Sequence, residues 1–127
     1  MRASITEGVQ DVAVISGDPA TFFCSAVGSD VDTQWTLDDA EYEECPSREE
    51  ADICFENSYV SDTVTTRSTL IIANSSSLGQ GSHTVQCIVE QNLDPGFGTN
   101  LFLESRTATL HIGGSPSFLF FLSSFSL

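Results

Sequence analysis

The stretch that decides the fold is residues 17–37, GDPATFFCSAVGSDVDTQWTL, together with Cys87 further along the chain. Every second residue from 20 to 26 is apolar, and Trp35 lies in a second alternating segment, 11 residues after Cys24. Cys87 follows the tryptophan by 52 residues. Because alternation with a period of two is typical of β-strands that bury one face, both segments are predicted strands.

Similar short segments recur along the chain and are separated by turn residues such as those at 16–19 and 74–77. No stretch shows the 3.6-residue repeat of a helix, so an all-β antiparallel sandwich is predicted. The predicted inward-facing residues are Phe22, Cys24, Thr33, Trp35, Leu37, Val85, Cys87, Val89, Ala108, Leu110 and Ile112. Residues 1–112 form the predicted domain, and residues 113–127 a Gly/Ser/Pro linker with a short apolar tail.

Four pieces of the chain together resemble the immunoglobulin superfamily: GDPATFFCSA, TQWTL, RSTLIIANSSSLGQGSHTVQC and ESRTATLHI. The resemblance covers about residues 5–112. It implies a Greek-key β-sandwich in which a disulfide between Cys24 and Cys87 joins the two sheets and Trp35 packs against it.

The four cysteines have no zinc-type spacing, which favours two disulfides and an oxidising compartment. Three pairings are possible from the count alone. The immunoglobulin resemblance implies Cys24–Cys87 and leaves Cys45 and Cys54 as a local staple. No apolar signal segment follows Met1, so we expect a fragment of a larger ectodomain.

The chain also departs from the family pattern. Gly81 and Val85 stand where the family has an aspartate and the tyrosine of the tyrosine corner. The stretch between Trp35 and Arg67 is long enough for additional C′, C″ and D strands, as in variable-type or intermediate-type domains. A divergent domain of this kind resembles those of invertebrate cell-surface receptors and adhesion molecules, for example sponge receptor tyrosine kinases.

The net charge of −14 arises from 18 acidic residues against four arginines and no lysine. This balance disfavours binding to nucleic acids and to anionic membrane surfaces, and direct membrane insertion by the domain is not expected. Half of the acids lie within 19 residues, at Asp38, Asp39, Glu41, Glu43, Glu44, Glu49, Glu50, Asp52 and Glu56. The run is interpreted as a solvated loop that protects a strand edge, as a surface that steers a basic partner, or as a calcium site. It lacks the D-x-D-x-D-G spacing, so no metal is predicted.

No catalytic constellation is evident, and the domain itself is predicted not to be an enzyme and to need no cofactor. His83 and His111 fall on the last two predicted strands, at outward or edge positions, and are expected to be solvated.

The segment from residue 91 to residue 103 is predicted to be a long, apolar loop that contacts a protein partner. The residues expected to do so are Leu93, Phe97, Leu101 and Phe102. The alternative is that some of them fold back onto the sheet as a hairpin. On the outward face of the strands that carry Trp35 and Cys87, Gln34 and Ile88 are further candidate contact residues.

Asn74-Ser75-Ser76 matches the acceptor sequence for N-glycosylation. The tail FLFFLSSFSL, residues 118–127, is too short to span a bilayer, which takes about 20 residues. It is interpreted as part of a transmembrane helix, a glycolipid-anchor signal, an alternative C-terminus or an artefact of expression or splicing.

These observations predict an extracellular recognition or cell-adhesion domain, at the cell surface or secreted, that binds a protein partner or a second copy of itself. The alternatives are a soluble immune-type module that binds carbohydrate or microbial ligands, and a structural spacer domain in a receptor ectodomain. Pocketed aromatics beside amides would favour the first alternative, and the absence of any binding would favour the second.

Overall fold

The computed structural model describes residues 3–46, 52–60, 64–92 and 101–114, and of Leu101 and Phe102 it describes the backbone only. Nine strands and one short 3₁₀ helix (η1) occur in these ranges. They are β1 (Ser4–Glu7), β2 (Val12–Ile15), β3 (Ala20–Val27), β4 (Val31–Leu37), β5 (Ala40–Glu41), β6 (Ile53–Val60), β7 (Thr65–Ile72), η1 (Ser75–Ser77), β8 (Gly81–Asn92) and β9 (Leu101–Gly113).

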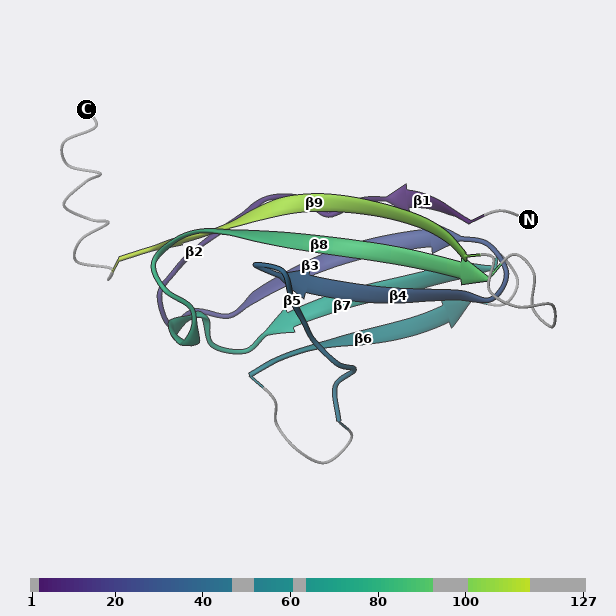
Figure 1. Ribbon diagram of the computed structural model, residues 1–127. Coiled ribbons are helices and arrows are strands. Elements are labelled where there is room, and N and C mark those ends of the chain that lie inside the picture. Colours follow the sequence, from purple (N-terminus) through teal and green to yellow (C-terminus); the bar gives the residue numbers. More distant parts are fainter. Residues whose placement is uncertain (1–2, 47–51, 61–63, 93–100, 115–127) are drawn as a thin grey trace.

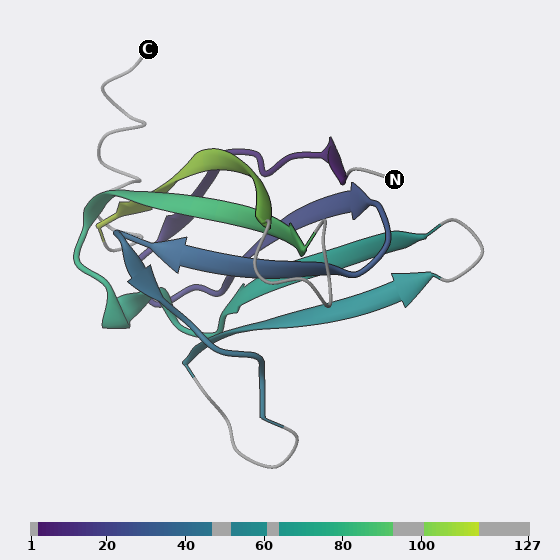
Figure 2. The same ribbon diagram turned by 45° about the vertical axis from the view of Figure 1, so that its right-hand side comes forward.

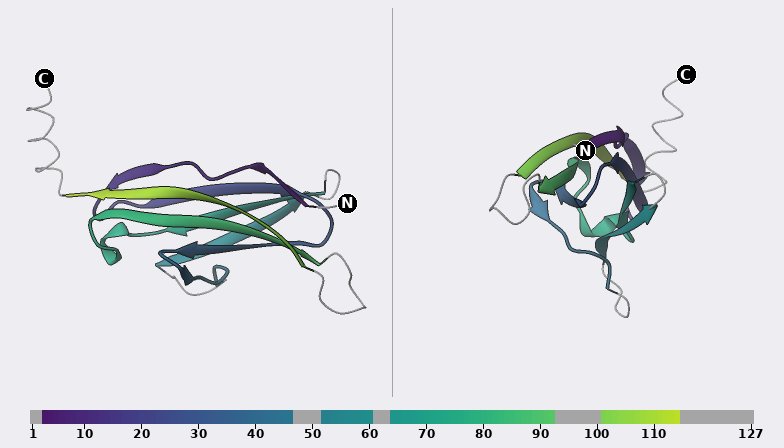
Figure 3. Two further views of the ribbon diagram at one scale, coloured as in Figure 1. Left: turned by 45° about the horizontal axis from the view of Figure 1, so that its top comes forward. Right: turned by 90° about the vertical axis from the view of Figure 1, so that its right-hand side faces the viewer.

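The strands form two sheets that pack face to face (Figure 1). One sheet has the order β1-β3-β7-β6 and the other the order β2-β9-β8-β4-β5. The view along the strands in Figure 3 shows the two layers curving around a common interior. β2 pairs with β9 in parallel, whereas the other strand pairs are antiparallel. β1 begins at one end of the sandwich and β9 ends at the other (Figure 1).

The core lies where the sequence alternation placed it. Trp35 lies opposite Cys87 in the β4–β8 ladder and is completely buried. A disulfide joins Cys24 of β3 to Cys87 of β8 and therefore links the two sheets. Phe22, Leu37 and Val85 are each at most 1% exposed and pack into the same cluster. Burial of side chains of this size stabilises the fold by about 1.5–3 kcal/mol each. The predicted sandwich with its inter-sheet disulfide is therefore confirmed.

The last two strands are longer than the sequence suggested. β8 continues to Asn92 and β9 already begins at Leu101, with an unbroken register from Gly81 opposite Ile112 to Asn92 opposite Leu101. The prediction of a loop over the whole of residues 91–103 was therefore wrong at both ends. Cross-strand pairing continues the ladder through these residues, because apolar and β-compatible side chains extend a strand rather than end it.

The region between β4 and β7 contains less strand than a variable-type pattern would give. β5, in the position of a C′ strand, has only two residues, and β6 takes the position of a D strand. Residues 42–46 and 52 form no further named strand, although Glu44 makes one bridge to Phe55. In Figure 2 the chain leaves the end of β5 in one sheet and passes the start of β6 in the other, where Glu44 meets Phe55.

Candidate protein-interaction face

The outward side of the five-stranded sheet is fixed by the residues that point inward. Val85, Cys87 and Val89 of β8 are completely buried, so the residues between them face away from the core. The same alternation along β4 and β9 brings three strands to one surface. We call this surface the outer face; it comprises Gln34, Thr36, Gln86, Ile88, Leu103, Ser105 and Thr107, with Asp32 and Glu90 at one end.

Ile88 lies at the middle of the outer face. Gln34 of β4 lies opposite it on one side, and Ser105 of β9 lies opposite it on the other. One row further along, the Thr36 hydroxyl donates a hydrogen bond of 3.2 Å to Oε1 of Gln86, which holds that amide against the sheet. The side chains of Gln34 and Ser105 are exposed. Two predicted contact residues, Gln34 and Ile88, therefore lie side by side.

Leu103 adds a second large apolar residue to the outer face. It lies opposite Glu90 in the β8–β9 ladder, on the diagonal from Ile88, and 59% of it is exposed. Diagonal neighbours on one sheet face are within reach of long side chains. The sequence interpretation assigned this leucine to a loop; its place beside Ile88 follows only from the register of β9.

The centre of the outer face carries no charged side chain, although the chain as a whole has a net charge of −14. Gln34, Thr36, Gln86, Ile88 and Ser105 are all uncharged. The nearest carboxylates are those of Asp32 and Glu90, one row along from Ile88, and that of Glu41 in β5, opposite Thr36. Depletion of charge at the centre of a patch is the compositional feature that marks protein interfaces.

Four other residues were predicted to contact a partner. Leu93 and Phe97 lie outside the described residues. Leu101 and Phe102 lie in the first residues of β9, where only their backbone is described. Their role in partner binding stays a prediction. The alternative interpretation, that some residues of the 91–103 segment fold back onto the sheet as a hairpin, agrees with the observed pairing of residues 101–103 with β8.

Asn74 lies at the start of η1 and is exposed. Its Oδ1 accepts a hydrogen bond of 2.9 Å from the backbone N–H of Ser76. The amide nitrogen, which is the atom that a glycan modifies, is not needed for this bond. Glycosylation at Asn74 stays a prediction.

The surroundings of His83 differ from those predicted from the sequence. Its ring is not solvated: Nδ1 lies 2.6 Å from Oδ2 of Asp38, and Nε2 contacts the backbone carbonyl of Gly79. Asp38 reaches back from the turn after β4, and its Oδ1 also accepts a hydrogen bond of 2.9 Å from the N–H of Thr84. No sequence pattern links an aspartate and a histidine 45 residues apart, so the expectation of a solvated histidine was wrong.

Both titratable groups respond to this contact. The hydrogen bonds that the His83 ring donates to Asp38 and to the Gly79 carbonyl raise the pKa of His83 above its ordinary value. Burial on its own would raise the pKa of Asp38, but the hydrogen bonds from His83 and Thr84 outweigh it and hold that pKa below its ordinary value. Because both ring nitrogens face oxygen acceptors, the doubly protonated imidazolium is the form that satisfies them.

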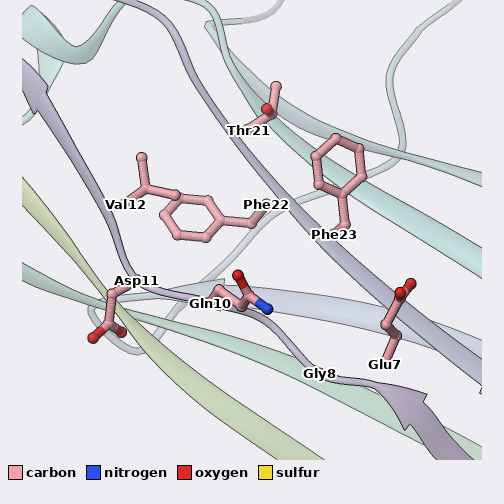
Figure 4. A pocket seen from close by; sticks show the side chains of 8 residues that line it. All are labelled: Glu7, Gly8, Gln10, Asp11, Val12, Thr21, Phe22 and Phe23. Atoms are coloured by element: carbon pink, nitrogen blue, oxygen red, sulfur yellow. The ribbon is translucent and has the colours of Figure 1, made fainter.

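A small hollow lies between β3 and the connection from β1 to β2 (Figure 4). Val12 and Phe22 form its apolar wall, and Glu7 and Gln10 lie on its polar side. Asp11 at its edge is already engaged, because it accepts a hydrogen bond of 2.8 Å from the N–H of Thr109. The lining residues include no nucleophile paired with a base.

Two general features of the described residues bear on function. No group of three or more His, Cys, Asp or Glu side chains there is arranged to hold a metal ion. None of those residues belongs to a helix with the length and hydrophobicity needed to cross a bilayer.

No family model matches the chain, and no curated protein matches its sequence. Solved structures of immunoglobulin domains do match. The titin M4 domain (trigonal form) is 18% identical over 87% of this chain and 95% of its own, with a TM-score of 0.58. The tandem immunoglobulin repeats of Dlar are 22% identical over 87% of this chain and 47% of theirs, also with a TM-score of 0.58.

A mutant complex of titin M10 with the obscurin-like 1 immunoglobulin domain is a further match, with 12% identity, a TM-score of 0.60 and coverage of 90% of this chain and 95% of that one. At these identities the likeness shows the fold alone. The chain is an immunoglobulin-like β-sandwich module, and the structures that it resembles are non-catalytic immunoglobulin domains.

Proposed function

We propose that this chain is a recognition domain of an extracellular receptor or adhesion protein, and that its outer face binds a protein partner, in the first place a second copy of the chain. The domain comprises residues 1–112, followed by the linker and tail of residues 113–127. The observation that carries the proposal is the uncharged centre of the outer face around Ile88, on a molecule that is otherwise strongly acidic.

The chemistry of the outer face suits contact between two copies. Gln34 and Gln86 carry amides, each of which both donates and accepts hydrogen bonds. A two-fold contact brings the same patch of each copy together, so its groups must be self-complementary. Amides meet this condition and carboxylates do not. Ile88 and the exposed Leu103 supply the apolar area between them.

The extracellular assignment is supported by the two disulfides, Cys24–Cys87 and Cys45–Cys54, which leave no free cysteine. Disulfides form and persist in oxidising compartments. Protein binding is also supported by similar immunoglobulin domains, since the matching solved structures include complexes with obscurin-like 1 and with telethonin.

A structural spacer is the second candidate. The structures that the chain resembles include tandem immunoglobulin repeats, in which one domain follows another. A spacer would bind neither itself nor a partner through the outer face, and substitutions there would leave association unchanged.

A bead-clustering assay separates the two candidates. Beads that carry many copies of the full chain convert a weak contact into a strong multivalent one. We expect the beads to cluster at about 0.15 M salt, where charge repulsion is screened beyond about 8 Å. Leu103→Asp should abolish clustering, whereas Phe23→Asp, which places the same charge at an equally exposed residue of the other sheet, should not. Beads that never cluster would favour the spacer.

A further inference from the structure

The inner side of β6 is uncovered over its second half. Phe55 points into the sandwich and is 6% exposed. Asn57 and Tyr59 follow at the same inward positions of the strand, yet both are exposed, and 59% of Tyr59 is accessible. Thr66, opposite Tyr59 on β7, is buried. The sandwich therefore opens along this edge, beyond Phe55.

The opening results from the shortness of β5. This strand pairs only with Thr36 and Leu37 at the end of β4, so it does not extend alongside the beginning of β4. A groove of about 530 Å³ lies between that part of β4 and the second half of β6. It is lined by Asp30, Val31, Asp32, Glu44, Asn57, Ser58, Tyr59 and Thr66.

The backbone of β6 shows which of its groups face this groove. The N–H of Cys45 donates to the Phe55 carbonyl at 2.8 Å, and the N–H of Phe55 donates to the Glu43 carbonyl at 3.2 Å. Phe55 therefore directs both backbone groups away from β7. Because the direction alternates along a strand, Asn57 and Tyr59 direct theirs to the same side. Within the described part of the chain neither makes a backbone hydrogen bond on that side.

The second disulfide defines where the open edge starts. Cys45 is bonded to Cys54 at the beginning of β6, and Glu44 forms a parallel bridge with Phe55. The short segment 43–45 thus lies in the position of a neighbouring strand at Phe55. In a regular sheet a neighbouring strand would lie about 4.8 Å from β6. Beyond Phe55, no described residue occupies that place beside Asn57 and Tyr59.

The groove has the chemistry to receive a cationic side chain. Asp30, Asp32 and Glu44 bring three carboxylates to its lining, and no arginine lies among the lining residues. The exposed ring of Tyr59 adds an aromatic surface, and such a surface attracts guanidinium and ammonium groups. An open strand edge and an aromatic–acidic wall therefore occur together.

We propose that an extended, basic peptide segment of a partner protein adds as a strand to the open edge of β6. Its backbone pairs with Asn57 and Tyr59, and an arginine or lysine side chain lies between the Tyr59 ring and the carboxylates. This strand addition is a recognised mode of peptide binding. It is a second surface, separate from the centre of the outer face, with Asp32 at the border of both.

The test uses the full chain and a labelled peptide that alternates arginine and valine, followed by fluorescence anisotropy and by amide NMR shifts. We expect saturable one-to-one binding and the largest shifts at Asn57 and Tyr59. Tyr59→Ala should weaken binding about fivefold or more. Phe23→Ala, an equally exposed aromatic on β3, is the matched control and should have no effect.

Two further comparisons separate strand addition from attraction to a generally acidic surface. Asp30→Asn should weaken binding, whereas Asp39→Asn, another exposed aspartate with positive φ, should not. A peptide methylated at alternate backbone nitrogens should lose binding, because it cannot pair with the strand. Equal binding by the methylated peptide, equal binding to Tyr59→Ala, or no binding at millimolar peptide would overturn the proposal. Leu103→Asp should leave peptide binding unchanged, so this result and that of the bead assay are independent.

Discussion

The indole nitrogen of Trp35 donates a hydrogen bond of 2.7 Å to the Ser68 hydroxyl, and both side chains are buried. Trp35 belongs to β4 and Ser68 to β7, so the bond connects the two sheets through the middle of the core. Ser68 lies opposite Cys24 in the β3–β7 ladder, next to the inter-sheet disulfide. The Cys24–Cys87 disulfide and the Trp35–Ser68 hydrogen bond thus join the two sheets side by side in the core.

Removal of the Ser68 hydroxyl should therefore lower the free energy of unfolding. Ser68→Ala leaves the indole N–H buried without an acceptor, which costs about 1–3 kcal/mol of unfolding free energy. Chemical denaturation monitored by tryptophan fluorescence measures this loss. Ser105→Ala, an exposed serine on β9, is the control and should change the stability by less than about 0.5 kcal/mol. Equal stabilities of the two variants would show that the Trp35–Ser68 bond contributes nothing.

His83 should keep its second ring proton to a higher pH than an ordinary histidine does. Asp38 and the Gly79 carbonyl accept from its two ring nitrogens, and these contacts raise its pKa. Nitrogen-detected NMR of the histidine side chains should show more than half of the His83 rings protonated on both nitrogens at about pH 6.5, the ordinary pKa of histidine. A neutral ring with one unprotonated nitrogen at that pH would contradict the assigned contacts.

The same pair should make stability depend on pH in a defined direction. Because the pKa of His83 is raised on folding, its contribution is complete below the ordinary value of about 6.5 and is lost as the pH rises through the folded value. Because the pKa of Asp38 is lowered, its contribution is present above about 3.9 and is lost as the pH falls through the folded value.

The difference in Tm between the native chain and His83→Gln should therefore be largest between about pH 4 and 6.5 and should shrink at higher pH. Thermal melts over a pH series measure it. His111→Gln removes an exposed imidazole that Asp38 does not contact, and it serves as the control. If the Tm difference between the native chain and His83→Gln grew as the pH rose above about 7, it would contradict a raised pKa of His83.

The turn from β4 to β5 should prefer glycine at its second position. Asp38 and Asp39 both have positive φ, 51° and 68°, between the paired residues Leu37 and Ala40. Two-residue hairpins of this kind favour Gly, Asn and Asp. Asp39→Gly and Asp39→Ala remove the same carboxylate, so their comparison isolates the backbone effect. We expect the glycine variant to be about 1 kcal/mol more stable in denaturant unfolding; equal stabilities would contradict a strained turn.

Much of the fold could be predicted from the sequence because the core residues alternate strictly. The alternation predicted the sandwich, the resemblance to the immunoglobulin superfamily implied the disulfide between Cys24 and Cys87, and the structure confirms both. The extent of β8 and β9 could not be predicted, because the apolar residues at 101–103 suit a loop anchor and a strand equally well. The register that brings Leu103 beside Ile88 is a property of the paired strands.

The candidate surfaces were less accessible to sequence reasoning. The alternation around Trp35 and Cys87 placed Gln34 and Ile88 on one outward face, but it could not show that the centre of that face is free of charge. The groove beside Tyr59 depends on how short β5 is and on where the segment 43–45 crosses to β6. The contact between Asp38 and His83 depends on the left-handed conformation of Asp38 in the turn after β4, and no sequence pattern links that turn to a histidine 45 residues away.

Sedimentation velocity tests the proposed role of the outer face most directly. The full chain and a version that ends at Gly114 are compared from micromolar to near-millimolar concentration at about 0.15 M salt, where charges are screened. We expect a concentration-dependent dimer in both, which Leu103→Asp weakens at least tenfold and Phe23→Asp leaves unchanged. A monomer at all concentrations, or a dimer equally insensitive to both substitutions, would contradict binding through the outer face.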